Sequence, residues 1–198
     1  MTDNPAQPAA ACVLLAAGLG SRFGGGKLKA EFRGEPLYRR AMDALPRELL
    51  VRTVVVSGSE EILAEAQRRG FETVRNDRPE EGISRSIRLG LSAVGPCSGV
   101  LFLVGDQPLL TKDSVRHILR TAAEHPEKII APVRPDGELG NPCFFPAAFF
   151  PELRALEGDR GGRRVIRAHP EALCTVSLPE EELTDTDTRE EFRRLENR

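Results

Sequence analysis

The stretch that most constrains this chain is a glycine-rich loop close to its N-terminus. Residues 12–28 read Cys-Val-Leu-Leu-Ala-Ala-Gly-Leu-Gly-Ser-Arg-Phe-Gly-Gly-Gly-Lys-Leu, so an apolar run opens into a loop that holds five glycines. Glycine lets backbone N–H groups approach an anion closely, and Arg22 and Lys27 add positive charges to the same loop. The pattern predicts a buried strand over residues 12–17 that ends in a phosphate-binding loop. A glycine-rich hairpin without a ligand is the alternative.

The two commonest phosphate-binding motifs do not fit this loop. The dinucleotide-binding fingerprint requires a third glycine where Phe23 stands, and an acidic residue at the end of the second strand, which here ends in Val56-Ser57. The ATPase P-loop requires a glycine where Ser21 stands, and a serine or threonine in place of Leu28. The loop is therefore predicted to belong to a different class of phosphate-binding protein.

Length and charge limit what the chain can bind. It has 198 residues, enough for one domain with a substantial core, and a formal net charge of −2. That charge argues against binding nucleic acid or an anionic membrane through bulk positive charge, so we expect a small-molecule partner. Only four lysines occur, and Lys27 and Lys29 lie in or beside the glycine loop. Lysine is thus not a general surface residue of this chain, which strengthens the prediction that Lys27 binds a phosphate.

The cysteines and the N-terminus favour an intracellular protein. The cysteines at positions 12, 97, 143 and 174 show no Cys-x-x-Cys spacing, which indicates neither a zinc site nor a disulfide framework. Residues 1–10 read as a loose tail before a single domain over residues 11–198. The apolar residues 9–17 lack the positive start of a signal peptide, and no stretch reaches the length of a membrane span. We expect a cytoplasmic protein.

Strands and helices alternate along the first two thirds of the chain. Apolar runs predict strands over residues 12–17, 51–57, 71–75, 99–104 and 128–133, and the segments between them predict helices over residues 36–45, 60–69, 83–94 and 112–124. This order predicts an α/β fold, a mostly parallel, Rossmann-like open sheet with helices on both faces. The rest is less regular, with strands predicted at 142–145 and 172–178 and helices at 147–156, from about 163, and at 189–196.

Asp106 comes directly after the predicted strand 99–104 and Gly105. Ligands of open α/β sheets bind beyond the carboxyl ends of the strands, so we expect Asp106 to meet the glycine loop in space. A carboxylate there suits Mg²⁺, which takes one or two carboxylates plus substrate phosphates. An aspartate that only caps a loop is the alternative. Near the end of the chain, Asp185-Thr186-Asp187-Thr188 either supplies a second carboxylate to the same metal or caps the last helix through Asp187 or Thr188.

Two further segments could hold parts of a ligand. Asn76, with the glycine and serines of residues 82–90, could bind an anion or a polar ring, or these residues could simply cap a helix. Residues 158–163 read Gly-Asp-Arg-Gly-Gly-Arg and could hold a second phosphate, or form a turn with solvated arginines. The three histidines show no catalytic spacing and no nucleophile motif occurs, so covalent catalysis is not expected.

The loop segment Leu-Ala-Ala-Gly-Leu-Gly-Ser-Arg-Phe-Gly-Gly-Gly-Lys resembles the signature of the nucleotidyltransferases with a glycosyltransferase-A-like fold, above all the branch that contains molybdenum cofactor cytidylyltransferase. The resemblance extends over residues 11–195. Residues 105–109 (Gly-Asp-Gln-Pro-Leu) are similar to the metal-binding segment of that branch, and residues 185–188 to its late Asp-x-Asp-Thr motif. The chain departs from the family at residues 189–191, where Arg-Glu-Glu replaces Pro-Glu-Asp, and at Lys29, Asn141 and Gly162, where relatives often have Leu, His and Ala.

The resemblance implies a role for each matching residue. It implies Mg²⁺ at Asp106 and Asp187, an acceptor at Asn141, Asp159 and Arg160, and catalysis by Arg22, Lys27 and Asp106. It implies that the nucleotide is bound by the loop and by two later segments, at Leu15, Ala16, Ala17, Gly18, Gly20, Arg22, Lys27, Asn76, Gly82, Ser86 and Asp106. Ala16-Ala17 favours CTP, because the guanylyl branch tends to have Ala-Gly at these positions.

The implied function is transfer of a nucleoside monophosphate, CMP from CTP, to a phosphorylated acceptor, the molybdopterin cofactor, with release of pyrophosphate. One alternative is a transferase of the same fold that acts on a sugar phosphate or another small phosphorylated alcohol. The other is a non-catalytic nucleotide-binding accessory protein, with a molybdenum enzyme as its partner. The complete set of Lys27, Asp106 and Asp187 favours an enzyme. No nucleic-acid or membrane partner is expected.

Overall fold

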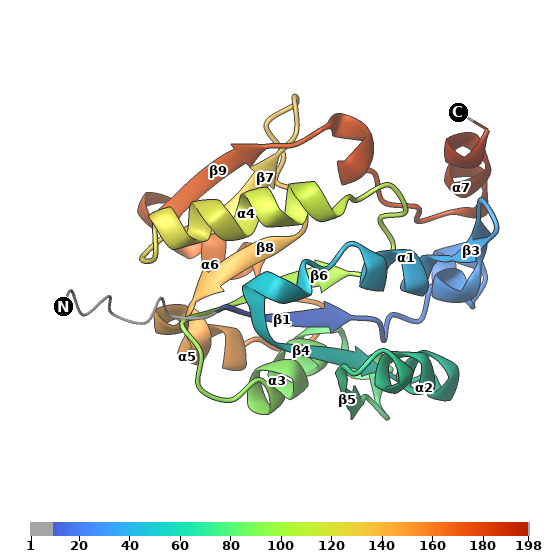
Figure 1. The fold of residues 1–198 in the computed structure, drawn as a ribbon, viewed down its shortest axis with the longest axis horizontal. Helices are drawn as coiled ribbons and strands as arrows, with labels where there is room; N and C mark the ends of the chain where they lie inside the picture. Colours follow the sequence, from blue (N-terminus) through green and yellow to red (C-terminus); the bar gives the residue numbers. More distant parts are fainter. Residues whose placement is uncertain (1–9, 198) are drawn as a thin grey trace.

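A computed structural model describes residues 10–197 of the chain. Its centre is a seven-stranded sheet with the strand order β5-β4-β1-β6-β8-β7-β9 (Figure 1). Neighbouring strands pair in parallel, except that β8 is antiparallel to both β6 and β7. The predicted mostly parallel α/β fold is confirmed. The strands of the sheet are β1 (Ala10–Leu15), β4 (Leu50–Ser57), β5 (Glu72–Arg75), β6 (Gly99–Val104), β7 (Ile129–Val133), β8 (Cys143–Pro146) and β9 (Leu173–Ser177).

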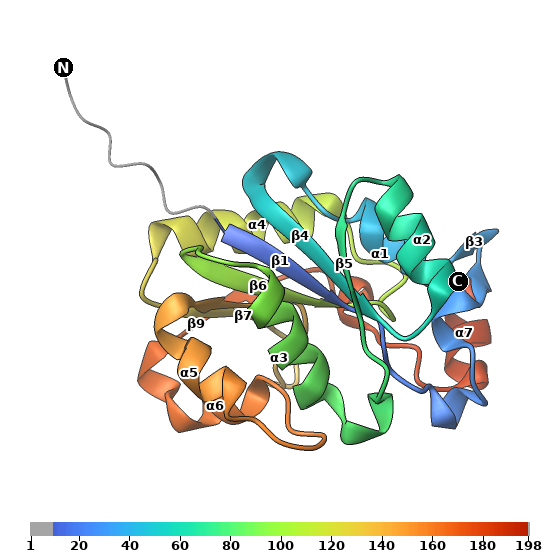
Figure 2. The ribbon, with the colours of Figure 1, turned by 90° about the horizontal axis from the view of Figure 1, so that it is seen from below.

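Helices cover both faces of the sheet and form three layers with it (Figure 2). One face carries α1 (Leu37–Asp43), α2 (Glu60–Arg68) and α4 (Lys112–Glu124), and the other carries α3 (Ile83–Ala93), α5 (Phe150–Arg154) and α6 (Arg163–Ala168). Successive residues of a strand face opposite sides of the sheet. Leu14 of β1 and Leu103 of β6 therefore enter the first core, and Val13 and Phe102 enter the second.

A smaller apolar cluster ties the last helix, α7 (Arg189–Glu196), to the glycine loop. The ring of Phe192 lies 5.7 Å from the ring of Phe23 in the loop, and 5.7 Å from the ring of Phe32, in edge-to-face contacts. Phe32 belongs to a short hairpin of β2 (Glu31–Phe32) and β3 (Glu35–Pro36). Figures 1 and 2 both show α7 beside this hairpin. The last helix is thus packed onto the glycine loop and this hairpin.

The predicted elements differ from the observed ones mainly at their ends. β1 starts at Ala10, inside the predicted tail, and ends at Leu15; the rest of that tail, residues 1–9, lies outside the described residues. The prediction of one helix over 147–156 is wrong, since a 3-10 turn (Ala147–Phe149) precedes α5. Pro151 has no N–H for a helix interior and is tolerated in a first turn, so the α-helix begins beside it. Within residues 10–197 we find no helix long and apolar enough to cross a membrane.

Candidate active site

The glycine loop leaves β1 at the carboxyl edge of the sheet and forms two short 3-10 turns, Ser21–Phe23 and Lys27–Lys29. Gly26 starts the second turn with a φ of 65°, a conformation that other L residues rarely adopt. Gly20 also has a positive φ, and a Cβ atom there would meet the Cβ of Lys27 at 3.0 Å. Glycine at these two positions lets the loop fold back and bring Lys27 against its own beginning.

Lys27 contacts two carboxylates that come from distant parts of the chain. Its Nζ lies 2.7 Å from Oδ2 of Asp106 and 2.9 Å from Oδ1 of Asp187. Nη1 of Arg22 lies 3.0 Å from the other oxygen of Asp187. Asp106 is brought here by β6, and Asp187 by the packing of α7 on the loop. We call Arg22, Lys27, Asp106 and Asp187 the charged cluster.

The charges in this cluster support one another. Lys27 is only 8% exposed, and burial alone would lower its pKa. The charge of Asp106 and hydrogen bonds to both aspartates outweigh burial and raise the pKa of Lys27 above its ordinary value. The hydrogen bond from Lys27, followed by the charges of Lys27 and Arg22, lowers the pKa of Asp187 despite its partial burial. Lys27 and Asp187 are therefore both ionised at neutral pH.

Buried carboxylate oxygens without partners lie in and beside the cluster. Oδ1 of Asp106 and Oδ1 of Asp185 accept no hydrogen bond from the part of the chain that the structure describes. Burial, followed by the charge of Asp106, raises the pKa of Asp185 to about 6, although Nη2 of Arg134 lies 3.5 Å from its Oδ2. A buried polar atom without a partner is costly. The oxygen donors at Asp106 and Asp187 fit a hard divalent cation, which is commonly held by one or two carboxylates plus phosphates of a substrate.

The last helix is capped by Thr188 and not by Asp187. The Thr188 hydroxyl accepts a hydrogen bond from the backbone N–H of Glu191, and the Glu191 carboxylate accepts one from the backbone N–H of Thr188. This capping box leaves the carboxylate of Asp187 free to contact Lys27 and Arg22. Capping by Asp187 is thus wrong, and its role as a metal ligand stays a prediction. The cap is Thr188, and the residue in the cluster is Asp187.

A cavity of about 350 Å³ lies at this edge of the sheet, and we call it the first cavity. The charged cluster forms part of its wall, together with the glycine loop and the start of α3. Ala16 is 3% exposed and is not among the lining residues. Most residues predicted to bind a nucleotide do line it, namely Leu15, Ala17, Gly18, Gly20, Arg22, Lys27, Gly82, Ser86 and Asp106.

Asn76 lies beneath the first cavity and not in its wall. It is 1% exposed, and its side-chain amide donates a hydrogen bond of 3.0 Å to Oγ of Ser86. Its Oδ1 accepts hydrogen bonds from the backbone N–H of Arg78 and from Nε of Arg85. Because Ser86 accepts from Asn76, the Ser86 hydroxyl can still donate its own hydrogen to another group. Asn76 therefore holds Ser86 in place, and Ser86 is the residue that lines the cavity.

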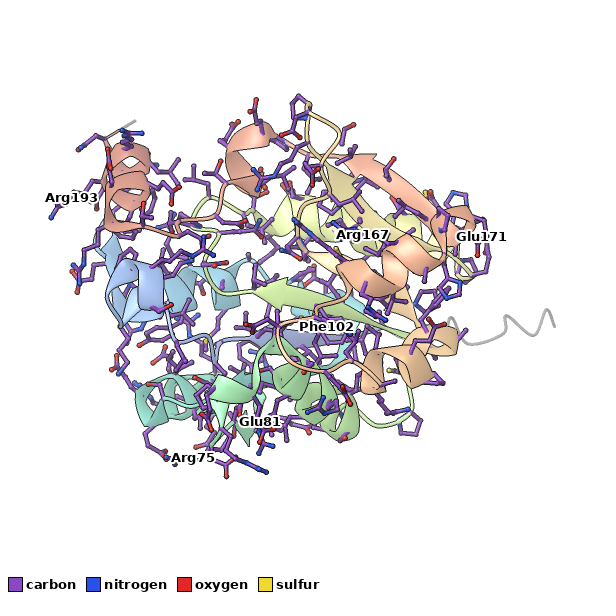
Figure 3. The ribbon with its side chains drawn as sticks, turned by 180° about the vertical axis from the view of Figure 1, so that it is seen from behind. Arg75, Glu81, Phe102, Arg167, Glu171 and Arg193 are labelled. Atoms are coloured by element: carbon purple, nitrogen blue, oxygen red, sulfur yellow. The ribbon has the colours of Figure 1, made fainter. Side chains whose placement is uncertain are left out.

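A second cavity of about 710 Å³ adjoins the first, and Leu15, Ile83, Val104 and Asp159 line both. All three residues that the resemblance assigns to an acceptor, Asn141, Asp159 and Arg160, are in its wall. Its apolar side includes Phe102 and Phe145, whose rings meet edge to face at 6.0 Å. Phe102 of β6 packs in the core on the side of the sheet that α6 covers, and Figure 3 shows this side with Arg167 of α6.

Three arginines of α6 also line the second cavity, Arg163, Arg164 and Arg167. Arg164 and Arg167 were not among the residues predicted from the sequence to bind a ligand. Their spacing could have indicated them, because arginines at 160, 163, 164 and 167 follow the intervals of three and four that define one helix face. The arginines were missed because charged residues at such spacing are ordinary on a solvated helix.

Comparison with known proteins places the chain in a family. Residues 12–173 match the family described as "MobA-like NTP transferase domain". The purine catabolism protein PucB of Bacillus subtilis (strain 168) is 29% identical to this chain over 195 residues, which cover 91% of this chain and 92% of PucB.

Solved structures share the fold. Rv0371c from Mycobacterium tuberculosis H37Rv has a TM-score of 0.80 and 24% identity, over 97% of this chain and 100% of that chain. A complex of Rv0371c with manganese has a TM-score of 0.75 and 24% identity, over 96% and 98% of the two chains. A nucleotidyl transferase from Methanothermobacter thermautotroptrophicus has a TM-score of 0.79 and 22% identity, over 96% of both chains. Since the family match covers most of its residues, the chain belongs to the MobA-like NTP transferases and is a nucleotidyltransferase.

Proposed function

We propose that this nucleotidyltransferase transfers CMP from CTP to the phosphate of a small acceptor, for which the molybdopterin cofactor is our first candidate, and releases pyrophosphate. The observation that carries the proposal is the position of Lys27, which lies between two carboxylates in the wall of one cavity while a larger cavity adjoins it. The first cavity has the size and the cations for a nucleotide. The second has room for an acceptor whose reacting group reaches the shared wall.

The chain's own residues would supply positioning and charge. Backbone N–H groups of the glycine loop, with Arg22 and Lys27, would bind oxygens of the triphosphate. An oxygen of the acceptor phosphate attacks the α-phosphorus, the bond between that phosphorus and the bridging oxygen of pyrophosphate breaks, and pyrophosphate leaves with the bonding electrons. The attacking oxygen is already ionised at neutral pH, so no side chain has to remove a proton. Such a reaction depends mostly on positioning and charge neutralisation.

We propose Asp106 and Asp187 as the residues that would hold Mg²⁺. The unpartnered Oδ1 of Asp106 supports this role, and so does the closeness of both carboxylates to one point, the Nζ of Lys27. A divalent cation bound there would neutralise charge on the triphosphate oxygens. The manganese complex of Rv0371c supports a divalent cation in a protein of the same fold.

The preference for CTP rests on two features. Ala16-Ala17 is the pair found in the cytidylyl branch that the loop resembles. Ser86, whose hydroxyl hydrogen is free to donate, suits a base that presents hydrogen-bond acceptors. Cytosine has two adjacent acceptors on its pairing edge, N3 and O2, whereas guanine has one acceptor, O6, beside two donors. Both features favour CTP over GTP.

Calorimetric titration with CTP, GTP and ATP in the presence of Mg²⁺ tests the nucleotide. We expect CTP to bind most tightly, and equal affinities or a preference for GTP would remove the cytidylyl assignment. Release of pyrophosphate, assayed with molybdopterin, a sugar phosphate and a small phosphorylated alcohol, tests the acceptor. Nucleotide binding without turnover on any acceptor would favour the accessory role beside a molybdenum enzyme.

A further inference from the structure

The second cavity has a rim of four arginines that lack a carboxylate partner. Arg160, Arg163, Arg164 and Arg167 line the cavity and are exposed, and within residues 10–197 none of them forms an ion pair. Arg163 donates one hydrogen bond to the carbonyl oxygen of Leu139. We call these four residues the arginine rim.

The rim contrasts with other arginines on the surface. Arg116, for example, pairs with both Glu48 and Asp113 at 2.7 and 2.8 Å. Guanidinium groups gathered without acids raise the local positive potential, and that potential favours an anion that can accept several of their N–H donors. Among the described residues that line the second cavity, Asp159 is the one acid, and it lies at the boundary with the first cavity.

The rim is separated from the reacting groups. Arg160, Arg163, Arg164 and Arg167 line the second cavity only, whereas Arg22 and Lys27 line the first cavity only. An acceptor phosphate that reacts with the nucleotide has to lie at the shared boundary. The rim arginines are therefore placed to bind a different part of the acceptor.

The surface between the two ends is apolar and aromatic. Phe102, Phe145 and Ile87 are each 6% exposed or less and line the second cavity. Such a surface suits the face of a flat ring. Asp159, at the boundary, can accept a hydrogen bond from an amino or hydroxyl group on that ring.

We propose that the acceptor is a flat ring compound with anionic groups at both ends, and that Arg164 and Arg167 bind the end that does not react. This inference rests on the proposed function for the position of the reacting phosphate. It adds a second anionic group to the acceptor and assigns residues to it.

A pair of matched probes tests this inference. 2-Naphthyl phosphate carries one anionic group, and 6-carboxy-2-naphthyl phosphate carries a second at the opposite end of the same flat ring. Each is titrated calorimetrically into the full chain, with and without the non-reacting α,β-methylene analogue of CTP and Mg²⁺. We expect the carboxylated probe to bind about tenfold more tightly, the ratio that one additional charge-assisted contact gives. In the Arg164→Gln/Arg167→Gln variant the two probes should bind equally.

The control variant, Arg120→Gln/Arg193→Gln, removes the same charge from exposed arginines outside both cavities. Arg193 lies far from Arg167 in Figure 3. The control should keep the preference of the wild type. The inference is overturned if the wild type binds neither probe or both equally, if the preference survives in the rim variant, or if the control loses it too. If the CTP analogue does not bind, the result contradicts the proposed function. The comparison of the two probes without nucleotide still tests the arginine rim on its own.

Discussion

The two cavities handle charge in opposite ways. In the first, the cations Lys27 and Arg22 lie against Asp106 and Asp187 before any ligand arrives. In the second, the cations of the arginine rim have no acidic partner among residues 10–197. The first cavity is thus nearly neutral and the second is positive. A charged ligand of the first cavity has to replace a contact between two charged side chains of the protein. An anion is attracted to the second cavity directly.

If the proposed function holds, exchange of charged partners would link metal binding and nucleotide binding in the first cavity. A triphosphate alone has to compete with Asp106 and Asp187 for Lys27. A divalent cation alone has to compete with Lys27 for the same two carboxylates. When both ligands bind, the triphosphate pairs with Lys27 and the divalent cation pairs with Asp106 and Asp187. We therefore expect each to raise the affinity of the other, and by the same factor in both directions.

The largest effect is expected from Lys27→Met. Loss of this cation should reduce turnover by about 100-fold or more, the effect of removing one preorganised hydrogen-bond donor to a transition state. At the same time, the metal-free protein should bind Mn²⁺ more tightly without nucleotide, because Asp106 and Asp187 lose their competitor. Turnover is followed by pyrophosphate release, and Mn²⁺ binding by electron paramagnetic resonance of the free ion.

Lys29→Met is the matched control, since Lys29 lies in the same turn and pairs with Glu61 instead. It should leave Mn²⁺ binding unchanged. A Lys27→Met protein with near-normal turnover and a lower melting temperature would show that Lys27 is structural.

The next largest effect is expected from the aspartates. Loss of a residue that hydrogen-bonds to a metal ligand lowers metal affinity by about 10–100-fold. Asp106→Asn or Asp187→Asn removes a proposed ligand itself, so each should lower the affinity for Mn²⁺ by at least as much. The double variant should bind Mn²⁺ little more weakly than the worse single variant, because ligands that act as a unit are not additive. Titration of Mn²⁺ in the presence of CTP measures all three.

Thr188→Ala separates the metal role from the capping role. It should lower the free energy of unfolding by about 1 kcal/mol through loss of the cap, with an unchanged requirement for metal. An Asp187→Asn protein that keeps the wild-type metal requirement would remove Asp187 from the metal site and leave Asp106 as the one ligand we propose.

In the second cavity, Gly162→Ala tests the packing of the apolar side. A Cβ atom at Gly162 would meet Cζ of Phe145 at 2.6 Å, and Phe145 is 1% exposed. The ring has to move, and such overpacking costs about 1–3 kcal/mol of unfolding free energy. Urea unfolding measures the loss. Gly161→Ala is the control, because its Cβ would meet Ile83 at an ordinary 3.7 Å. Equal stability of the two variants would contradict a tightly packed ring.

The smallest effect is expected from Asp185→Asn, and it depends on pH. The pKa of Asp185 is raised from 3.8 to about 6 in the fold, so ionisation of this carboxyl destabilises the folded state. The variant and the wild type should be about equally stable below pH 4. Above pH 6 the variant should be more stable by about 1 kcal/mol, a value reduced by solvent because the side chain is 35% exposed. Urea unfolding with EDTA across this range checks it. A difference that does not change with pH would exclude the titration of Asp185 as the cause.

Sequence reasoning reached the fold because the alternation of apolar strands and helices is regular up to Val133. It also placed Asp106 beside the glycine loop, since both follow strands that end at one edge of a parallel sheet. It did not reveal that Lys27 is buried. A lysine among glycines reads as exposed, whereas Lys27 is buried against Asp106 and Asp187, which come from distant parts of the chain. Nor does the run Cys-Phe-Phe-Pro at 143–146 indicate the direction of β8, which depends on its pairing with β6.

The reversed direction of β8 affects how such a protein can diversify. Cys143, the first residue of β8, pairs with Phe102 near the carboxyl end of β6, so residues 134–142 enter the sheet at the ligand-binding edge. A loop that enters a strand at this edge can change in length or sequence without shifting the register of the strand. The glycine loop, β1 and α3 lie in a separate part of the chain. Under the proposed function, exchange of residues 134–142, of which Asn141 lines the second cavity, would therefore be a route to a new acceptor specificity that leaves nucleotide selection unchanged.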